Sequence, residues 1–242
     1  MESCEFTLKH YRQILEQAKD ASYEFLRLMD VGRLTPEKRQ IVLRHDIDFS
    51  VADAMRMATL ERDVGGICST YCVLLHAPTY HVGEVETYRL LKEIMKMGHE
   101  IALHYDLSFF EEAGISPLEG MEREASFLGE IMGTNIVSVA QHKPGTYGRF
   151  TGVGKRFIDA YSPMLIEDIR YLSDSRRTWR SGCVCEHLKS TPAIQALIHP
   201  EWWEAKDAKN RRGTIERLVQ THQNDVTVFM REYAANMEKK PE

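Results

Sequence analysis

The 242-residue sequence lacks several features that mark particular classes of protein. No apolar run approaches the roughly 18 residues that a membrane-spanning helix needs, and the N-terminal stretch carries charges where a signal peptide has an apolar core. Basic residues are nowhere concentrated, and a net charge of −5 gives no electrostatic footprint for nucleic acid. We therefore expect a cytoplasmic protein with no membrane insertion and no nucleic-acid partner.

Cysteine is also scarce, with five residues in the chain. An odd number favours free thiols in a reducing compartment over a framework of disulfides. Cys183, Cys185 and His187 are of metal-ligand type, but no second pair at zinc-finger spacing accompanies them. Cys68 and Cys72 lie in an apolar run, which predicts two small core residues.

Neither an internal repeat of about 20 to 50 residues nor a low-complexity segment interrupts the chain. Its length suits one hydrophobic core of barrel size. We expect a single domain over 1–242, with a helical covering segment at 1–38, a catalytic core at 39–203 and a C-terminal helix within 204–242.

Apolar periodicity predicts strands that alternate with helices. The spacing predicts a long amphipathic helix from Leu8 to Leu28. Buried strands are predicted within 39–48, 67–75, 99–104, 135–141, 168–174 and 193–199. Further helices are predicted at 51–65, 84–98, 117–132 and 214–237. This alternation indicates an α/β fold with parallel βαβ units.

Histidine or aspartate stands at the end of five of these strands, in "RHDID", "LHYD", "QHKPG", "SDS" and "LIHP". Each alone has a structural explanation: Asp48 or Ser50 can cap the next helix, and His104 can be an ordinary interior histidine. Parallel sheets, however, bind ligands at the carboxyl ends of their strands. Five polar ends that converge there predict an active site.

The doublet of Asp46 and Asp48 indicates a metal. Residues two apart on an extended strand point to the same side, so both carboxylates can reach one centre. Their mutual repulsion is relieved by a divalent cation, and carboxylate with imidazole suits zinc or another first-row ion. One aspartate can bind the metal while the other acts as a base.

With these motifs the sequence resembles the polysaccharide deacetylase superfamily of NodB-like carbohydrate esterases, from about Ile41 to Trp203. The resemblance implies a distorted (β/α) barrel of about seven strands with extra N- and C-terminal helices. "LRHDID" resembles the first family motif, which implies that Asp46 is the general base and Asp48 a metal ligand. "GHEIALH" is similar to the next motif and implies that His104 is a second ligand.

The sequence departs from the family at the third ligand. The family's second metal histidine would stand four residues after His104, where this chain has Ser108. "QHKPG" resembles the family's arginine-and-proline motif with His142 in the arginine's place. We expect His142 to be the substitute ligand, with Asp106 as the next candidate and His45 as the third.

The last two motifs imply the remaining catalytic and substrate-binding residues. "SDSRRTW" is similar to the fourth motif, so Asp174 is expected to orient the catalytic histidine and Trp179 to line the pocket. "LIHP" resembles the motif that makes His199 the general acid. Trp202 is a candidate for stacking on a sugar ring or for packing the last helix, and Arg176 for an anionic substrate group or for a solvated charge run.

We expect a metal-dependent hydrolase that removes an N-acyl group from a sugar. The expected cation is zinc, and the expected acyl group is acetyl. The expected substrate is an intracellular precursor of a surface polysaccharide, as in O-antigen biosynthesis. One alternative is the hydrolysis of another non-peptide carbon–nitrogen bond. The other alternative is a catalytically degenerate protein that binds a sugar or a partner, motivated by Ser108.

Overall fold

The computed structural model describes residues 4–204, 206 and 210–237. The chain forms two compact units, 1–207 and 208–242, and each is described by itself. The ends of the predicted terminal segments, 1–3 and 238–242, lie outside the described residues, as do 205 and 207–209. The assignment of the whole chain to a single domain stays a prediction.

The first unit is built on one parallel sheet. Its strands are β1 (Glu24–Leu26), β2 (Gln40–Ile47), β3 (Thr70–Leu74), β4 (Glu100–Tyr105), β5 (Ser138–Gln141), β6 (Ile158–Asp159), β7 (Arg170–Ser173) and β8 (Ala193–Ile198). Seven of them follow the order β6-β5-β4-β3-β2-β8-β7, and β1 pairs with β2 outside this path. The α/β class and the prediction of about seven parallel strands in a barrel-like sheet are confirmed.

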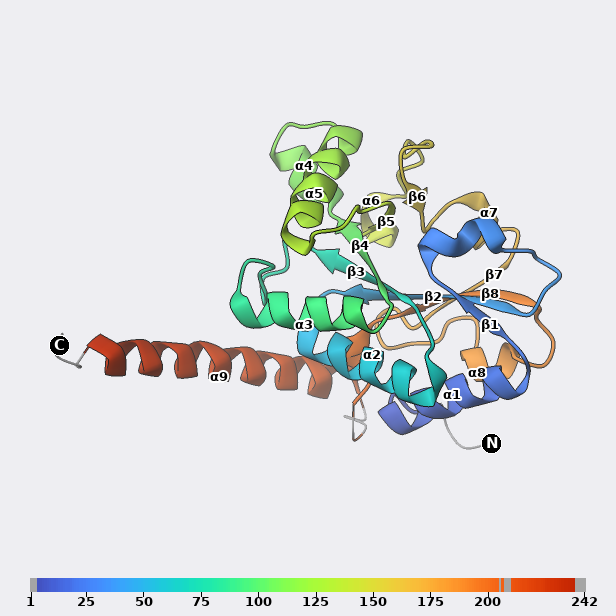
Figure 1. The fold of residues 1–242 in the computed structure, drawn as a ribbon, viewed down its shortest axis with the longest axis horizontal. Coiled ribbons are helices and arrows are strands. Elements are labelled where there is room, and N and C mark those ends of the chain that lie inside the picture. Colours follow the sequence, from blue (N-terminus) through green and yellow to red (C-terminus); the bar gives the residue numbers. More distant parts are fainter. Residues whose placement is uncertain (1–3, 205, 207–209, 238–242) are drawn as a thin grey trace. The chain divides into compact units, whose positions relative to one another are not determined.

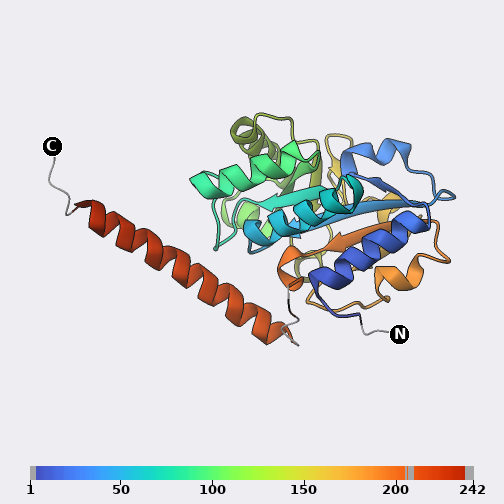
Figure 2. The same ribbon diagram turned by 60° about the horizontal axis from the view of Figure 1, so that its bottom comes forward.

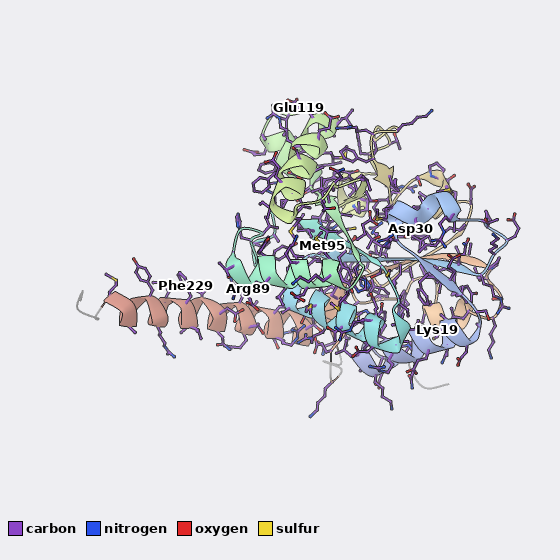
Figure 3. All side chains as sticks on the ribbon, viewed as in Figure 1. Lys19, Asp30, Arg89, Met95, Glu119 and Phe229 are labelled. Carbon is purple, nitrogen blue, oxygen red and sulfur yellow. The ribbon has the colours of Figure 1, made fainter. Side chains whose placement is uncertain are left out.

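Helices surround this sheet. They are α1 (Leu8–Asp20), α2 (Val51–Gly65), α3 (Val85–Lys96), α4 (Leu107–Glu112), α5 (Pro117–Met132), α6 (Pro144–Tyr147), α7 (Pro163–Ile166) and α8 (Val184–His187), with short 3-10 helices at Leu28–Arg33 and Pro200–Trp202. Figures 1 and 2 show α1, α2 and α3 side by side along one side of the sheet. Charged side chains such as Lys19 of α1, Arg89 of α3 and Glu119 of α5 lie on the outer, exposed side of the helices (Figure 3).

The second unit contains helix α9 (Arg211–Met237), which agrees with the predicted C-terminal helix. Among the helices of the described residues, none has the length and apolar character to cross a membrane.

Local sequence signals explain most of the helix ends. The Ser50 side chain accepts a hydrogen bond from Asp53 N at 3.1 Å, which caps the start of α2, and Gly66 ends that helix in the left-handed region at φ 67°. Ser116 and Pro117 open α5 in the same way. These signals are local in sequence, so the predicted helices at 51–65 and 117–132 are confirmed.

The predicted helix from Leu8 to Leu28 is wrong in its second half. Helix α1 ends at Asp20, and Ser22 has a φ of 62°, a left-handed conformation that cannot continue a helix. Residues 24–26 instead form β1, which pairs in parallel with 40–42 of β2. Phe25 and Leu28 keep a helical spacing in the sequence. Pairing with β2 gives the backbone N–H and C=O groups of this segment hydrogen-bond partners and still buries its apolar side chains.

A buried carboxylate joins α1, α2 and the sheet. Glu61 Oε1 accepts hydrogen bonds from the Tyr11 hydroxyl at 2.5 Å and lies 2.6 Å from His45 Nε2. Its Oε2 accepts from the Ser69 and Tyr71 hydroxyls at 2.6 and 3.2 Å. Burial opposes ionisation, but the charge and hydrogen bond of His45 outweigh it and lower the pKa of Glu61. This network therefore holds a paired charge in the core.

Replacing Glu61 with alanine is expected to lower the free energy of unfolding by about 3–5 kcal/mol, because the loss of one partner leaves the other polar groups buried and unpaired. Urea denaturation followed by circular dichroism measures this change. The matched control is Glu16→Ala, which removes an exposed pair with Arg12 at 3.9 Å and should change stability by less than about 0.5 kcal/mol. Equal denaturation midpoints for the two variants would contradict the role given to Glu61.

Candidate metal and acid–base site

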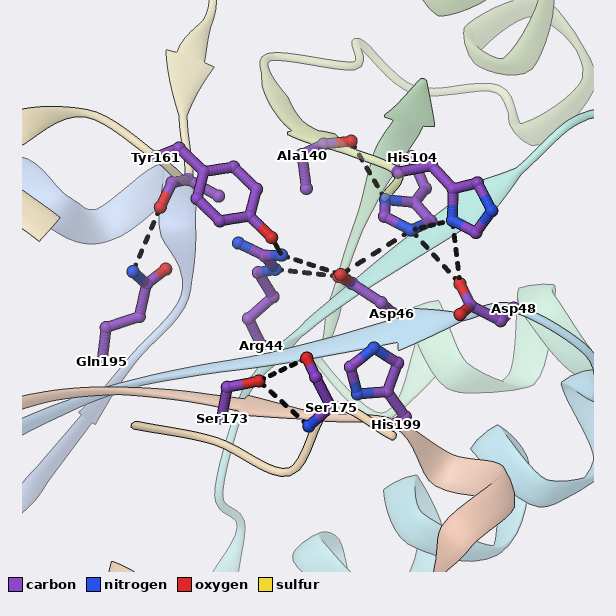
Figure 4. A network of polar contacts seen from close by, with 12 residues as sticks. Arg44, Asp46, Asp48, His104, Ala140, Tyr161, Ser173, Ser175, Gln195 and His199 are labelled. Atoms are coloured by element: carbon purple, nitrogen blue, oxygen red, sulfur yellow. Dashed lines mark hydrogen bonds and ion pairs between the residues drawn. The ribbon is translucent and has the colours of Figure 1, made fainter. Parts of the chain in front are cut away.

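The carboxyl ends of the parallel strands meet at one edge of the sheet, and five of the predicted site residues come together there. Asp46 is on β2, Asp48 follows it, and His104 is on β4. His142 directly follows β5, and His199 directly follows β8. Figure 4 shows most of this group with its polar contacts. The convergence follows from the parallel topology, which brings strands distant in sequence to the same edge.

Asp46 is locked by an arginine of its own strand. Arg44 Nε donates to Asp46 Oδ1 at 2.8 Å, and Arg44 Nη2 donates to Oδ2 at 2.7 Å. The arginine and aspartate side chains are 0% and 2% exposed. Burial opposes ionisation of the carboxyl, but Arg44 and then His104 outweigh it and lower the pKa of Asp46 to about 2. Asp46 is therefore a carboxylate throughout the neutral pH range.

Asp48 forms a triangle with two histidines. Its Oδ1 lies 3.2 Å from His104 Nε2 and 3.3 Å from His142 Nδ1, and the two ring nitrogens are 3.1 Å apart. Neither contact to Oδ1 has hydrogen-bond geometry, so this buried oxygen has no hydrogen-bond partner among the described residues. Burial opposes ionisation, but His104 and His142 hold the pKa of Asp48 well below its usual range. Three ligand atoms thus face one point.

Neighbouring backbone groups orient these ligands. His104 Nδ1 lies 3.0 Å from the Ala140 carbonyl oxygen (Figure 4), and a hydrogen bond there requires the Nδ1–H tautomer. That tautomer leaves a lone pair on Nε2, the atom that faces Asp48. The backbone N–H of His142 donates to the Tyr105 carbonyl at 2.8 Å, which continues the pairing of β4 and β5 and fixes the second histidine beside the first.

Asp174 and His199 form a second charged pair at the same edge. His199 Nδ1 lies 2.6 Å from Asp174 Oδ1, whose carboxylate also accepts from the His199 backbone N–H at 3.0 Å. Trp203 Nε1 donates to Asp174 Oδ2 at 2.8 Å. Burial favours the neutral imidazole, but Asp174 outweighs it and raises the pKa of His199 to about 10. The ring is therefore protonated at neutral pH, with its Nε2–H directed away from Asp174.

The other two candidates for the third ligand lie in different surroundings. Asp106 caps α4, where its Oδ1 accepts from the backbone N–H and hydroxyl of Ser108 at 2.9 and 2.7 Å. His45 pairs with Glu61 on the other side of β2. Only His142 among the three candidates reaches the atoms of Asp48 and His104. Ser108 stabilises the turn after β4 through Asp106.

The three predicted substrate-binding residues differ in exposure. Trp179 is half-buried and stacks on Phe6, with ring centroids 6.3 Å apart and planes 11° apart. Trp202 is 6% exposed and belongs to the core, and Arg176 is exposed. Their contribution to substrate binding stays a prediction.

The sequence interpretation missed Arg44, Tyr161 and Glu201. Arg44 had a signal, because it stands two residues before Asp46 and so shares its face of the strand. Tyr161, whose hydroxyl accepts from Arg44 Nη2 at 2.8 Å, lies between the predicted strands at 135–141 and 168–174, where no element was predicted. Glu201 is 1% exposed, and burial together with the charge of Asp48 raises the pKa of its carboxyl well above the usual range.

Comparisons with known proteins give structural matches only. Neither a family model nor a curated protein matches the sequence. Solved structures that match include the Streptococcus pyogenes deacetylase PplD in complex with acetate, at 15% identity and a TM-score of 0.47, covering 85% of this chain and 84% of that chain. A family 4 carbohydrate esterase from Bacillus anthracis matches at 11% identity and a TM-score of 0.44, covering 89% and 86%.

A third match is a CE4 family pseudoenzyme from Bacillus anthracis, at 10% identity and a TM-score of 0.45, covering 79% of this chain and 63% of that chain. The three matched structures are thus a deacetylase, a carbohydrate esterase and a pseudoenzyme. The chemistry of this chain has to be judged from its own site.

Proposed function

We propose that this protein is a metal-dependent hydrolase that removes an N-acyl group, by preference N-acetyl, from a sugar. One observation carries the proposal. The triangle of Asp48, His104 and His142 adjoins both an ionised aspartate, Asp46, and a protonated histidine, His199. A metal site with a base and an acid beside it is the set of groups that hydrolysis of an amide requires.

The triangle fits a divalent cation, and zinc is the ion that we propose. Ligand atoms held about 2.0–2.2 Å from a tetrahedral zinc lie about 3.3–3.6 Å from one another. The three observed separations, 3.1, 3.2 and 3.3 Å, lie at or just below the short end of this range, so a shift of a few tenths of an ångström is enough to seat the ion. The buried Asp48 Oδ1, which lacks a hydrogen bond, gains a partner in this arrangement. A cation bound there supplies a Lewis acid that polarises the acyl carbonyl and lowers the pKa of water.

Asp46 is proposed as the general base. Each carboxylate oxygen has room for two hydrogen bonds, so the two bonds from Arg44 leave an acceptor position on each. Arg44 fixes the carboxylate and keeps it ionised, which allows it to take a proton from the water that attacks the acyl carbon.

His199 is proposed as the general acid. As the carbon–nitrogen bond breaks, its Nε2–H donates a proton to the departing amine, and Asp174 stabilises the imidazolium until then. The pKa values of about 2 for Asp46 and about 10 for His199 keep the base ionised and the acid protonated at the same pH.

The proposed substrate is a sugar precursor of a surface polysaccharide, such as one used in O-antigen biosynthesis. The exposed Arg176 is proposed to meet an anionic group of such a precursor, for example a nucleotide phosphate. The half-buried Trp179 is proposed to contact the apolar face of the sugar ring, whereas Trp202, at 6% exposed, packs in the core.

Replacing His142 with alanine is expected to remove about one equivalent of divalent metal per chain, because two remaining ligands bind zinc weakly. Metal analysis after dialysis measures this loss. Acetate release from N-acetylated sugars, both free and nucleotide-linked, should fall with it. His81→Ala, at an exposed histidine outside the site, is the matched control and should keep wild-type metal content and activity.

Two outcomes would change the proposal. An unchanged metal content in the His142 variant would exclude that histidine as a ligand. A wild-type protein that binds metal and sugar but releases no acyl group from any member of the panel would favour a catalytically degenerate binding protein.

A further inference from the structure

A second group of metal-ligand atoms lies away from the proposed active site. It comprises Cys4, His10, Cys183 and Cys185, whose Sγ and ring nitrogen atoms all lie within 4.8 Å of one another. Cys4 and His10 belong to the N-terminal segment, and the other two stand at the start of α8. The four residues come from segments about 180 residues apart, and the fold alone brings them together.

The separations within this group do not fit a disulfide. Cys4 Sγ and Cys185 Sγ are 3.6 Å apart, whereas a disulfide requires about 2.05 Å, and all five cysteines of the chain are free thiols. Cys183 Sγ lies 3.5 Å from His10 Nε2. Around tetrahedral zinc, with Zn–S near 2.3 Å and Zn–N near 2.05 Å, S···S and S···N separations are about 3.8 and 3.6 Å. Both observed separations match these edges.

The His10 ring is already oriented for this role. Its Nδ1 lies 3.5 Å from Gln13 Oε1, one turn along α1, while Nε2 faces Cys183. A partner on one ring nitrogen of a ligating histidine fixes the tautomer that offers the other nitrogen to the metal. The ring also lies nearly parallel to that of Trp203, with centroids 6.1 Å apart.

We propose that Cys4, His10, Cys183 and Cys185 form a structural zinc site, separate from the site of Asp48, His104 and His142. Three thiolates and one imidazole complete a tetrahedral shell and leave no open position for a substrate, which is the pattern of structural zinc. The donor set differs from that of the first site, since sulfur ligands favour zinc over hard cations such as magnesium.

The site joins the N-terminal segment to the segment that supports the proposed acid. Between Cys4 and His10, Phe6 stacks on Trp179 and packs edge-on against Trp203 at 5.3 Å. Trp203 in turn donates to Asp174. Zinc bound at the cluster therefore fixes the N-terminal covering segment against the residues that hold Asp174 and His199.

In the sequence, Cys183, Cys185 and His187 are of metal-ligand type but lack a second pair at zinc-finger spacing, so no metal site was predicted there. His187 Nε2 lies 2.7 Å from the Ser181 carbonyl and is not part of the cluster. The missing pair, Cys4 and His10, was not recognisable, because no spacing rule connects residues about 180 positions apart in the sequence.

Cobalt substitution tests this site independently of the first one. Thiolate ligands give cobalt(II) a charge-transfer absorption in the near ultraviolet, which the oxygen and nitrogen ligands of Asp48, His104 and His142 do not give. Wild-type protein loaded with cobalt should show this band. Cys4→Ser and Cys185→Ser should lose it together with about one equivalent of zinc, whereas the control Cys68→Ser should keep both.

Native thiol titration of zinc-loaded wild-type protein keeps the test decisive if a variant fails to fold. Cys4, Cys183 and Cys185 should be protected from a thiol reagent and become reactive once a chelator removes the metal, whereas Cys72, at 0% exposed, should stay unreactive in both states. Wild-type protein without the charge-transfer band, or with a disulfide between Cys4 and Cys185 after purification without reductant, would overturn the proposal. Loss of the band in His142→Ala would also overturn the separation of the two sites.

Discussion

Asp46→Asn is expected to lower kcat for acyl release by about 10²–10⁴-fold, the usual contribution of a general base, while the metal content stays at the wild-type level. Asparagine keeps the size of the side chain and still accepts a hydrogen bond from Arg44, but its amide cannot take a proton from water. Steady-state kinetics on an N-acetylated sugar, together with metal analysis of the same preparation, measure the two quantities.

The stability of this variant has to be measured as well, because Arg44 is 0% exposed and loses its charged partner. Thermal melting of Asp46→Asn separates lost chemistry from lost folding. The control Asp63→Asn changes an exposed aspartate that is paired with Arg62, and should leave kcat and the melting temperature unchanged. A folded, metal-loaded Asp46 variant with normal kcat would show that another group is the base.

Asp174→Asn is expected to move the alkaline limit of activity to lower pH. His199 acts as an acid only while it is protonated, so wild-type kcat/KM should fall as the pH rises through about 10. Without the Asp174 carboxylate, burial dominates and the pKa of His199 drops to about 6.5 or below. At pH 8 the ring is then protonated in about 3% of molecules or fewer, which corresponds to a loss of activity of at least about 30-fold.

The pH profile distinguishes this positioning role from a general structural defect. The Asp174 variant should regain activity as the pH is lowered below 6.5, because the small acid fraction then increases, whereas a misfolded protein would not recover. Asp168→Asn, at an exposed position before β7, is the matched control and should keep the wild-type profile. An alkaline limit that stays near 10 in Asp174→Asn would rule out Asp174 as the source of the raised pKa.

Local patterns were sufficient to predict most of the first unit. The alternation of short apolar runs with helical periodicity identified β2, β3, β4, β5, β7 and β8. Strand β1 was not predicted, because its three residues continue the helical spacing of α1 and only pairing with β2 makes them extended. Strand β6, with two residues, is too short to have a period.

The sequence by itself determined which residues stand at the carboxyl ends of the strands, and so predicted that Asp46, Asp48, His104 and His199 converge. This was possible because strand ends are local features and parallel strands share one edge. Only the tertiary structure decided which groups pair within that edge. It placed His142, the first of the three predicted candidates, beside Asp48 and kept Asp106 and His45 away from it, and it set Arg44 against Asp46.

The cluster of Cys4, His10, Cys183 and Cys185 shows the same limit more strongly. Each residue type was visible in the sequence, and the Cys183 and Cys185 pair was noted, but the fold brings this pair beside Cys4 and His10 across about 180 residues of sequence. Hydrophobic periodicity specifies which face of an element is buried, while contacts between elements far apart in sequence depend on packing of the whole core. The tertiary structure therefore decided where the second group of ligands forms.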